Sequence, residues 1–269
     1  MMRGSTKHGR MSSMSEYFPG RFTGKVGIVT GAGSGIGKAT IIRFAREGGI
    51  AIGVDVVLER LGQLEKDMAV MGLPVKTVCG DLVADSTINA IMEATGPKID
   101  ILINNAGIMD EFLPLDELDD ATWDRVIAVN LTSVMKLSRA VIRVMLKNGG
   151  GAIVTTSSGA SFKSGIAGTA YTTSKHGLNG LVKSISTIYG SQGIRSNAVA
   201  PGGTATNIMD MSKPIRGAKT LEALGVNMAN ASGTATPDQI AACLLFLASD
   251  DASNVNGVIM ASDGGWAAK

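Results

Sequence analysis

The sequence predicts an α/β protein in which helices cover both faces of a doubly wound parallel sheet of seven strands. Short apolar runs alternate with helical stretches from residue 25 onward, and such alternation with short connections is typical of parallel sheets. The composition agrees, because 45% of the residues are hydrophobic while only 4% are aromatic. A core of aliphatic side chains is what a sheet buried on both faces requires.

Each expected strand is a short apolar run. The strands are expected at 25–30, 50–56, 74–82, 98–107, 151–159, 193–202 and 256–265. Several stretches between them carry apolar residues three and four positions apart, which predicts helices with one apolar face. The helices are expected at 36–48, 57–71, about 86–95, about 121–147, about 169–190 and 237–249.

The domain organisation is expected to be simple. No shift in composition marks a second domain, so residues 21–269 are expected to form one domain. Residues 1–20 form a basic head without the apolar centre of a secretory signal, and a disordered extension is the favoured interpretation. Residues 203–235 lack clear periodicity, and because long irregular segments are usually functional or disordered we expect a substrate loop there.

Charge and rare residues exclude several classes of function. The net charge is +2, without a basic stripe for nucleic acid, and no run approaches the roughly 18 apolar residues of a membrane span. Cys79 and Cys243 lie far apart in apolar runs, which indicates buried thiols in a reducing compartment. The two histidines are too few to build a metal site by themselves. We therefore expect a cytoplasmic protein with no metal, nucleic-acid or membrane partner.

A glycine-rich loop follows the first expected strand and opens the first expected helix. Gly31, Gly35 and Gly37 permit a tight turn and a close approach of backbone N–H groups to a pyrophosphate. Asp55 ends the second strand, where a carboxylate accepts hydrogen bonds from the hydroxyls of an adenosine ribose and repels a 2′-phosphate. The loop carries Ser34 and no basic residue. Both features favour NAD over NADP.

A tyrosine and a lysine lie one helical turn apart in the segment TAYTTSKHG. If this stretch is helical, Tyr171 and Lys175 share one face. An ammonium near a phenol lowers the phenol pKa, and a phenol tuned in this way can exchange protons with an alcohol. An incidental surface pair is the alternative.

Together these motifs resemble the short-chain dehydrogenase/reductase family from about Phe22 to Trp266. The family's TGxxxGIG stands at 30–37, its NNAG at 104–107, its YxxxK at Tyr171 and Lys175, and its PG at 201–202. The resemblance implies a Rossmann fold and hydride transfer between NAD(H) and a secondary alcohol or ketone. It also implies a homotetramer or homodimer, built on the helices at about 121–147 and 169–190.

The resemblance implies roles for individual residues. Tyr171 would be the acid/base, Lys175 would lower its pKa and bind the nicotinamide ribose, Ser158 would hold the substrate oxygen, and Asn130 would support a proton-relay water. Ser157 is the neighbouring alternative to Ser158, and Asn104 and Asn105 could instead tie strands together. The implied cofactor-binding residues are Gly31, Ser34, Gly35, Ile36, Gly37, Asp55, Asp81, Leu82, Asn105, Ala106, Gly107, Tyr171, Lys175, Pro201, Gly202, Thr204 and Thr206.

The substrate stays open at this stage. The loops at 108–112, 159–167 and 203–235 are expected to select it. Met209, Met211 and Met228 would suit an apolar ligand, while Asp110 and Glu111 could favour a polyol. Two alternative functions are a 3-oxoacyl thioester reductase, which Asp55 opposes because that reaction usually needs NADPH, and a nucleotide-binding module without turnover.

Overall fold

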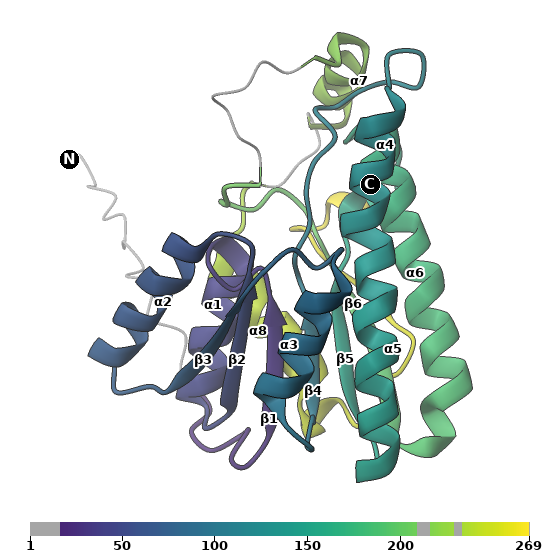
Figure 1. Ribbon diagram of the computed structural model, residues 1–269. Coiled ribbons are helices and arrows are strands. Elements are labelled where there is room, and N and C mark those ends of the chain that lie inside the picture. The colour runs from purple at the N-terminus through teal and green to yellow at the C-terminus, as the bar shows by residue number, and fades with distance from the viewer. Residues whose placement is uncertain (1–16, 209–215, 229–232, 269) are drawn as a thin grey trace, which may run out of the picture.

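The computed structural model describes residues 17–208, 216–228 and 233–268, and within them seven parallel strands form one sheet. The strand order is β3-β2-β1-β4-β5-β6-β7 (Figure 1), which confirms the predicted fold class. The strands are β1 (Val26–Thr30), β2 (Ile50–Asp55), β3 (Val75–Cys79), β4 (Ile101–Asn104), β5 (Gly151–Thr156), β6 (Ile194–Pro201) and β7 (Ile259–Ser262). The helices are α1 (Gly35–Arg46), α2 (Leu58–Val70), α3 (Asp85–Thr95), α4 (Asp120–Ile127), α5 (Ser133–Met145), α6 (Thr169–Tyr189), α7 (Ala218–Met228) and α8 (Pro237–Ala248).

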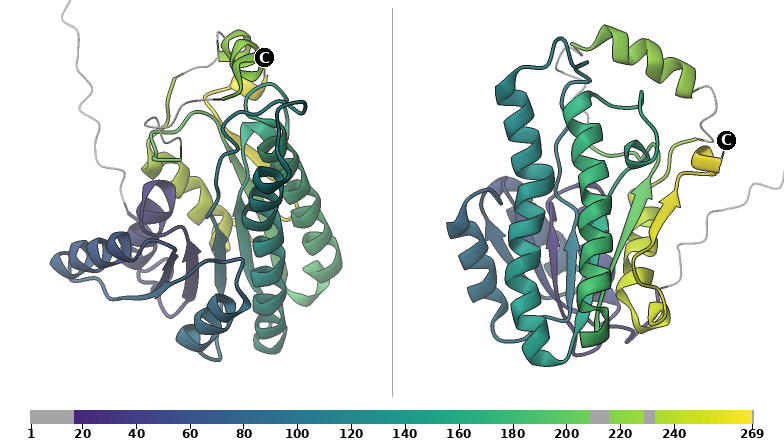
Figure 2. Two further views of the ribbon diagram at one scale, coloured as in Figure 1. Left: turned by 45° about the horizontal axis from the view of Figure 1, so that its top comes forward. Right: turned by 90° about the vertical axis from the view of Figure 1, so that its right-hand side faces the viewer.

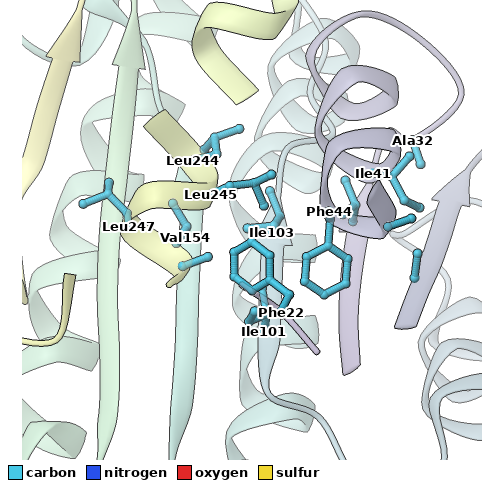
Figure 3. Close-up of a cluster of buried hydrophobic side chains, with 14 of the residues drawn as sticks. Phe22, Ala32, Ile41, Phe44, Ile101, Ile103, Val154, Leu244, Leu245 and Leu247 are labelled. Atoms are coloured by element: carbon cyan, nitrogen blue, oxygen red, sulfur yellow. The ribbon is translucent and has the colours of Figure 1, made fainter. Parts of the chain in front are cut away.

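Two apolar layers lie on opposite faces of the sheet. Ile28 and Val29 are neighbours in β1 and point to different layers, as alternation along a strand requires. Val29 joins the layer formed with α1, α2 and α8, in which the rings of Phe22 and Phe44 pack 4.9 Å apart beside Leu245 (Figure 3). Ile28 joins the layer formed with α3, α5 and α6. Burial on both faces explains why the strands are continuous apolar runs.

The long helix expected at 121–147 is two helices joined by a π-helical turn. This turn spans Ala128–Thr132 between α4 and α5. α4 and α6 are packed together, and both views show α5 and α6 side by side (Figures 1 and 2). The hydrogen bonds of a π-helical turn span one residue more than those of an α-helix. Asn130 lies in this turn and is fully buried.

The segment expected to be an irregular substrate loop contains a helix. α7 occupies Ala218–Met228 and lies past the carboxyl ends of the strands (Figures 1 and 2). From 218 to 225 none of its residues is buried. Residues 1–16, Met209 and Met211 lie outside the described residues.

The prediction that both cysteines are buried is wrong for Cys79. This thiol is exposed and Cys243 is half-buried. Cys79 ends β3, which is one of the two edge strands of the sheet, so only one side of it is covered by a neighbouring strand.

The strand order reverses direction between β1 and β4. The chain builds β1, β2 and β3 outward on one side and then crosses back to place β4 beside β1. In sheets of this kind the crevice outside the carboxyl ends of the strands, at the point of reversal, is where ligands bind.

Candidate active site

A cavity of about 500 Å³ lies at this reversal point. Its lining comes from the loops that follow six of the strands, β1 to β6, together with residues of α1, α2, α4 and α6. All of the predicted cofactor-binding residues except Gly37 line it, as do Ser158, Tyr171 and Lys175. The structure therefore gathers into one cavity residues that span 31–206 in the sequence.

The glycine loop forms one wall of this cavity. Gly31 and Gly35 have φ values of 66° and 50°, which favour glycine, and Ser34, Gly35 and Ile36 line the wall where α1 begins. Gly37 does not line the cavity. A Cβ at Gly37 would overlap the carbonyl oxygen of Gly31, so this glycine instead allows α1 to pack directly against the turn.

Asp55 lies at the far end of the cavity, and backbone N–H groups hold its carboxylate in place. Its Oδ2 accepts a hydrogen bond from the Gly33 N–H at 2.9 Å, and its Oδ1 accepts one from the Val57 N–H at 3.0 Å. Arg60, in the first turn of α2, lines the same end. A Cβ on Gly33 would lie 2.7 Å from the Arg60 Cβ and 2.8 Å from Asp55 Oδ2, so the stem of the Arg60 side chain and the Asp55 carboxylate border the same small space.

The loop after β4 is hydrogen-bonded to the end of β1, where the glycine loop begins. Asn105 donates from Nδ2 to the Thr30 carbonyl at 3.0 Å, and its own N–H donates to Thr30 Oγ1 at 2.9 Å, so it joins two strand ends while lining the cavity. Asn104 is buried and donates to Ser138 Oγ at 3.1 Å. Asn104 is therefore structural. Asp81 lines the cavity and is held by Arg125 at 2.8 Å.

Ser158, Tyr171 and Lys175 lie together in the lining of the cavity. The Tyr171 hydroxyl hydrogen-bonds Ser158, while Ser157 Oγ donates instead to Asn179 at 2.9 Å, so of the two serines it is Ser158 that contacts the phenol. Lys175 Nζ lies over the Tyr171 ring, 5.4 Å from its centroid, and donates to the Thr156 carbonyl at 2.9 Å. Both Tyr171 and Lys175 are buried.

The expected lowering of the Tyr171 pKa is not what the structure gives. Burial raises the pKa of Tyr171 to about 12, the hydrogen bond from Ser158 acts in the opposite direction, and the negative charge of Asp110 raises it further. Burial also lowers the pKa of Lys175 to about 8, so this lysine carries less than a full charge at moderately alkaline pH. The phenol is therefore protonated at neutral pH.

Asn130 is near the cavity but does not line it. Its Oδ1 accepts from the Ile108 N–H at 2.8 Å, and its Nδ2 donates to the Ile108 carbonyl at 2.9 Å and to Ser174 Oγ at 3.2 Å. These bonds tie the π-helical turn to the loop after β4. A Cβ on Gly107 would lie 3.3 Å from Asn130 Oδ1 and 3.6 Å from Lys175 Nζ, so the two polar groups border one narrow space.

The residues present fit a nicotinamide dinucleotide. A glycine-lined wall at a helix N-terminus suits the pyrophosphate, Asp55 offers carboxylate oxygens for a ribose, and Tyr171 and Lys175 stand at the opposite end. A Cβ at Gly31 would lie 3.0 Å from Asn105 Nδ2, so even one methyl group would crowd this wall.

Residues from the loops that are expected to select the substrate also line the cavity. Met109, Phe112 and Ile208 line it, together with Glu111, whose carboxylate lies 3.5 Å from Arg216. The expectation that Asp110 could favour a polyol is wrong, because Asp110 is fully buried and accepts hydrogen bonds from backbone N–H groups.

Comparisons with known proteins identify the class. The short chain dehydrogenase family model matches residues 25–216. A 3beta-hydroxysteroid dehydrogenase 2 from Eggerthella lenta is 38% identical over 250 residues, covering 91% of this chain and 95% of the relative. The crystal structure of levodione reductase has a TM-score of 0.83 at 33% identity, covering 92% of this chain and 99% of that one. A protein assigned as an NAD(P)-dependent gluconate 5-dehydrogenase from Beutenbergia cavernae, solved with NADP at low occupancy, has a TM-score of 0.81 at 32% identity, covering 94% and 100%.

The chain belongs to the short-chain dehydrogenase family. It is an oxidoreductase that transfers hydride between a nicotinamide cofactor and an alcohol or ketone. In the part of the chain that the structure describes, no group of three or more His, Cys, Asp or Glu side chains could hold a metal ion. No helix within the described ranges is long and apolar enough to span a bilayer.

Proposed function

We propose that this protein is an NAD-dependent dehydrogenase that interconverts an apolar secondary alcohol, of the alicyclic or steroid kind, with its ketone. One observation carries the proposal. Tyr171, its hydrogen-bonded Ser158 and Lys175 stand at the end of a cavity whose other end holds Asp55. The apolar side chains at the substrate end and the hydroxysteroid relative support the choice of alcohol.

Each side chain has a defined task in this mechanism. In alcohol oxidation the Tyr171 phenolate accepts the hydroxyl proton while Ser158 holds the same oxygen, and in ketone reduction the phenol returns that proton. The nicotinamide ring, when bound, accepts or supplies the hydride. Lys175, beside Tyr171, would bind the nicotinamide ribose. Asn130 holds the loop after β4, which borders both residues. The balance is one hydride to the cofactor and one proton to Tyr171 for each alcohol oxidised.

The test is NADH formation from NAD by the purified protein across a panel of secondary alcohols. The panel contains 3β-hydroxysteroids, alicyclic alcohols, polyols and hydroxy acids, with NADP in parallel and an acetoacetyl thioester with NADPH in the reverse direction. We expect the hydroxysteroids or alicyclic alcohols to react fastest, and with NAD. Fastest turnover of the thioester would favour the 3-oxoacyl reductase. NADH binding without turnover on any compound would favour the silent module.

Asp55 is proposed to select NAD, and its replacement tests this. We expect Asp55→Ala to raise the KM for NAD roughly ten- to hundredfold, because two charge-assisted hydrogen bonds to a ribose are lost. Discrimination against NADP should fall by a similar factor. Initial rates with both cofactors measure the effect, and Glu59→Ala, an exposed carboxylate one residue before Arg60, is the matched control.

Arg60 provides the reason to measure NADP at all. It borders the space beside Asp55 and could bind a 2′-phosphate once the carboxylate is gone. We expect the NADP activity of Asp55→Ala to disappear in Asp55→Ala/Arg60→Ala. Equal KM ratios for NAD and NADP in wild type and Asp55→Ala would remove Asp55 from the ribose site. The homotetramer and the cytoplasmic location suggested by the sequence remain predictions.

A further inference from the structure

A buried carboxylate from another part of the chain caps the helix that carries Tyr171. Asp110 lies in the loop after β4 and is fully buried. Its Oδ2 accepts a hydrogen bond from the Tyr171 N–H at 2.8 Å, and it also accepts one from the Gly168 N–H. The residue preceding α6 is Gly168, which has no side chain to cap the helix. Asp110 supplies that cap across space.

The fit between Asp110 and the helix is close. A Cβ on Gly168 would overlap both carboxylate oxygens of Asp110. The backbone of Gly168 is in an ordinary extended conformation, with φ −69° and ψ 177°, so glycine is not needed there for its conformation. It is needed for space, and the space is filled by the carboxylate.

The loop that carries Asp110 is itself constrained. Glu111 and Phe112 have φ values of 55° and 61°, and they are the only non-glycine residues with positive φ in the described chain. Asp110 holds this turn through the Phe112 N–H at 3.3 Å, and the Leu113 carbonyl accepts from the Thr169 N–H at 2.9 Å. Strained backbone persists where its surroundings fix it, commonly beside active sites. Here it joins the substrate end of the cavity to the start of α6.

The charges around the Tyr171 phenol are few. Asp110 faces it from the loop after β4, Lys175 faces it from its own helix, and the neutral Ser158 faces it from the loop after β5. The negative charge of Asp110 favours the protonated phenol. The pKa of Asp110 itself is raised by burial, against which its backbone hydrogen bonds act.

We propose that Asp110 is a positioning residue for the reaction, fixing the start of α6 and thereby the place of the Tyr171 hydroxyl beside Ser158. Its charge also favours the protonated phenol, which is the form that donates its proton to a ketone. This inference rests on the proposed role of Tyr171 as the acid/base.

The test compares two substitutions that disturb the contact in different ways. Asp110→Asn removes the charge and one acceptor, whereas Gly168→Ala pushes the carboxylate aside and keeps its charge. The matched controls are Asp119→Asn, which removes the exposed carboxylate that caps α4, and Gly180→Ala, an exposed glycine of α6 with open space around it. Turnover is measured with the alcohol from the panel that wild type oxidises, NADH binding by fluorescence, and phenol ionisation by the tyrosinate absorbance. The tyrosinate absorbance of the same protein with Tyr171→Phe is subtracted in each case, which leaves the contribution of Tyr171.

The two substitutions are expected to give different signatures. Both should lower kcat on the order of ten- to hundredfold, as a misplaced reacting group does, with the NADH Kd within about twofold of wild type. In Asp110→Asn the phenol should ionise roughly one pH unit lower than in wild type, and the pH profile of oxidation should move with it. In Gly168→Ala that shift should be smaller. The controls should match wild type.

Several outcomes overturn the inference. The first is an Asp110→Asn protein with wild-type kcat and wild-type phenol ionisation. The second is an Asp110→Asn protein that loses kcat, NADH binding and thermal stability together while its phenol ionisation is unchanged, because that result indicates a purely structural role. If Asp110→Asn does not fold, wild-type kcat in Gly168→Ala overturns it. Full turnover in Tyr171→Phe would instead refute the proposed role of Tyr171, so the two failures are distinguishable.

Discussion

Tyr171→Phe is expected to lower turnover by a factor on the order of 10² to 10⁴, the range that general acid–base catalysis supplies. The substitution removes only the hydroxyl that exchanges a proton with the substrate oxygen. The ring stays packed beside Ala160 and Ala167, and the Lys175 contact with its face is kept. The NADH Kd should therefore stay within about twofold of wild type.

The direction of the reaction gives a second signature. Because burial raises the pKa of Tyr171 to about 12, the protonated phenol is ready to donate to a ketone at neutral pH. Oxidation needs the phenolate, so its rate in wild type should rise with pH across the neutral and alkaline range. The residual rate of Tyr171→Phe should lack this rise.

Stopped-flow or steady-state absorbance of NADH measures both signatures. Tyr189→Phe, at the opposite end of α6, is the matched control for losing a phenol hydroxyl and should keep wild-type kinetics. A Tyr171→Phe protein with normal kcat would show that the proton is transferred by another group, and the mechanism proposed here would then be wrong.

The sequence was sufficient for the sheet because burial on both faces leaves a strong local signal. The seven apolar runs correspond to the seven strands, and the glycine loop follows β1 as expected. Each expected strand extends beyond the observed one at one or both ends, as at 98–107, where β4 covers only Ile101–Asn104. The residues after Asn104 leave the sheet to line the cavity.

Features that depend on contacts across the fold escaped prediction. The π-helical turn exists where Asn130 bonds both backbone groups of Ile108, 22 residues away in the chain, and no local pattern encodes this pair. The sequence suggests Asp110 as a contact for a polyol, yet in the fold this residue is buried against the start of α6. Arg60 became part of the cavity only because α2 folds back beside Asp55.

The pKa values of Tyr171 and Lys175 also could not be predicted from the sequence, because they depend on burial. The spacing of Tyr171 and Lys175 correctly places the two on one helix face, but spacing carries no information on burial. Burial opposes charge on both groups, raising the pKa of the phenol and lowering that of the ammonium. Sequence reasoning accounted for the attraction between the pair and not for the loss of water around it.

Lys175→Met is expected to abolish most turnover and yet to stabilise the fold at neutral pH. Burial lowers the pKa of Lys175 to about 8 from an ordinary 10.5, so below pH 8 the folded protein holds an ammonium that has lost much of its hydration. That difference in pKa corresponds to about 3 kcal/mol of unfolding free energy. The lost hydrogen bond to the Thr156 carbonyl offsets about 1 kcal/mol of it.

The sign of the pH dependence makes this prediction specific. The cost of the buried ammonium is fully present below about pH 8 and fades as pH rises toward 10.5, where the lysine is neutral in both folded and unfolded states. The stability gained by Lys175→Met should therefore be about 2 kcal/mol at pH 7 and should shrink steadily between pH 8 and 10. Urea unfolding at each pH measures it, with kcat falling by at least about a hundredfold throughout.

Lys183→Met provides the matched control, because Lys183 lies two turns further along α6 and is exposed. It should change neither kcat nor the pH dependence of stability. A Lys175→Met protein that is less stable than wild type at pH 7, or equally altered at every pH, would show that the ammonium is well accommodated in the folded protein. The predicted result would instead mean that the cavity keeps a lysine which destabilises the fold, and that its retention reflects the demands of hydride and proton transfer beside Tyr171.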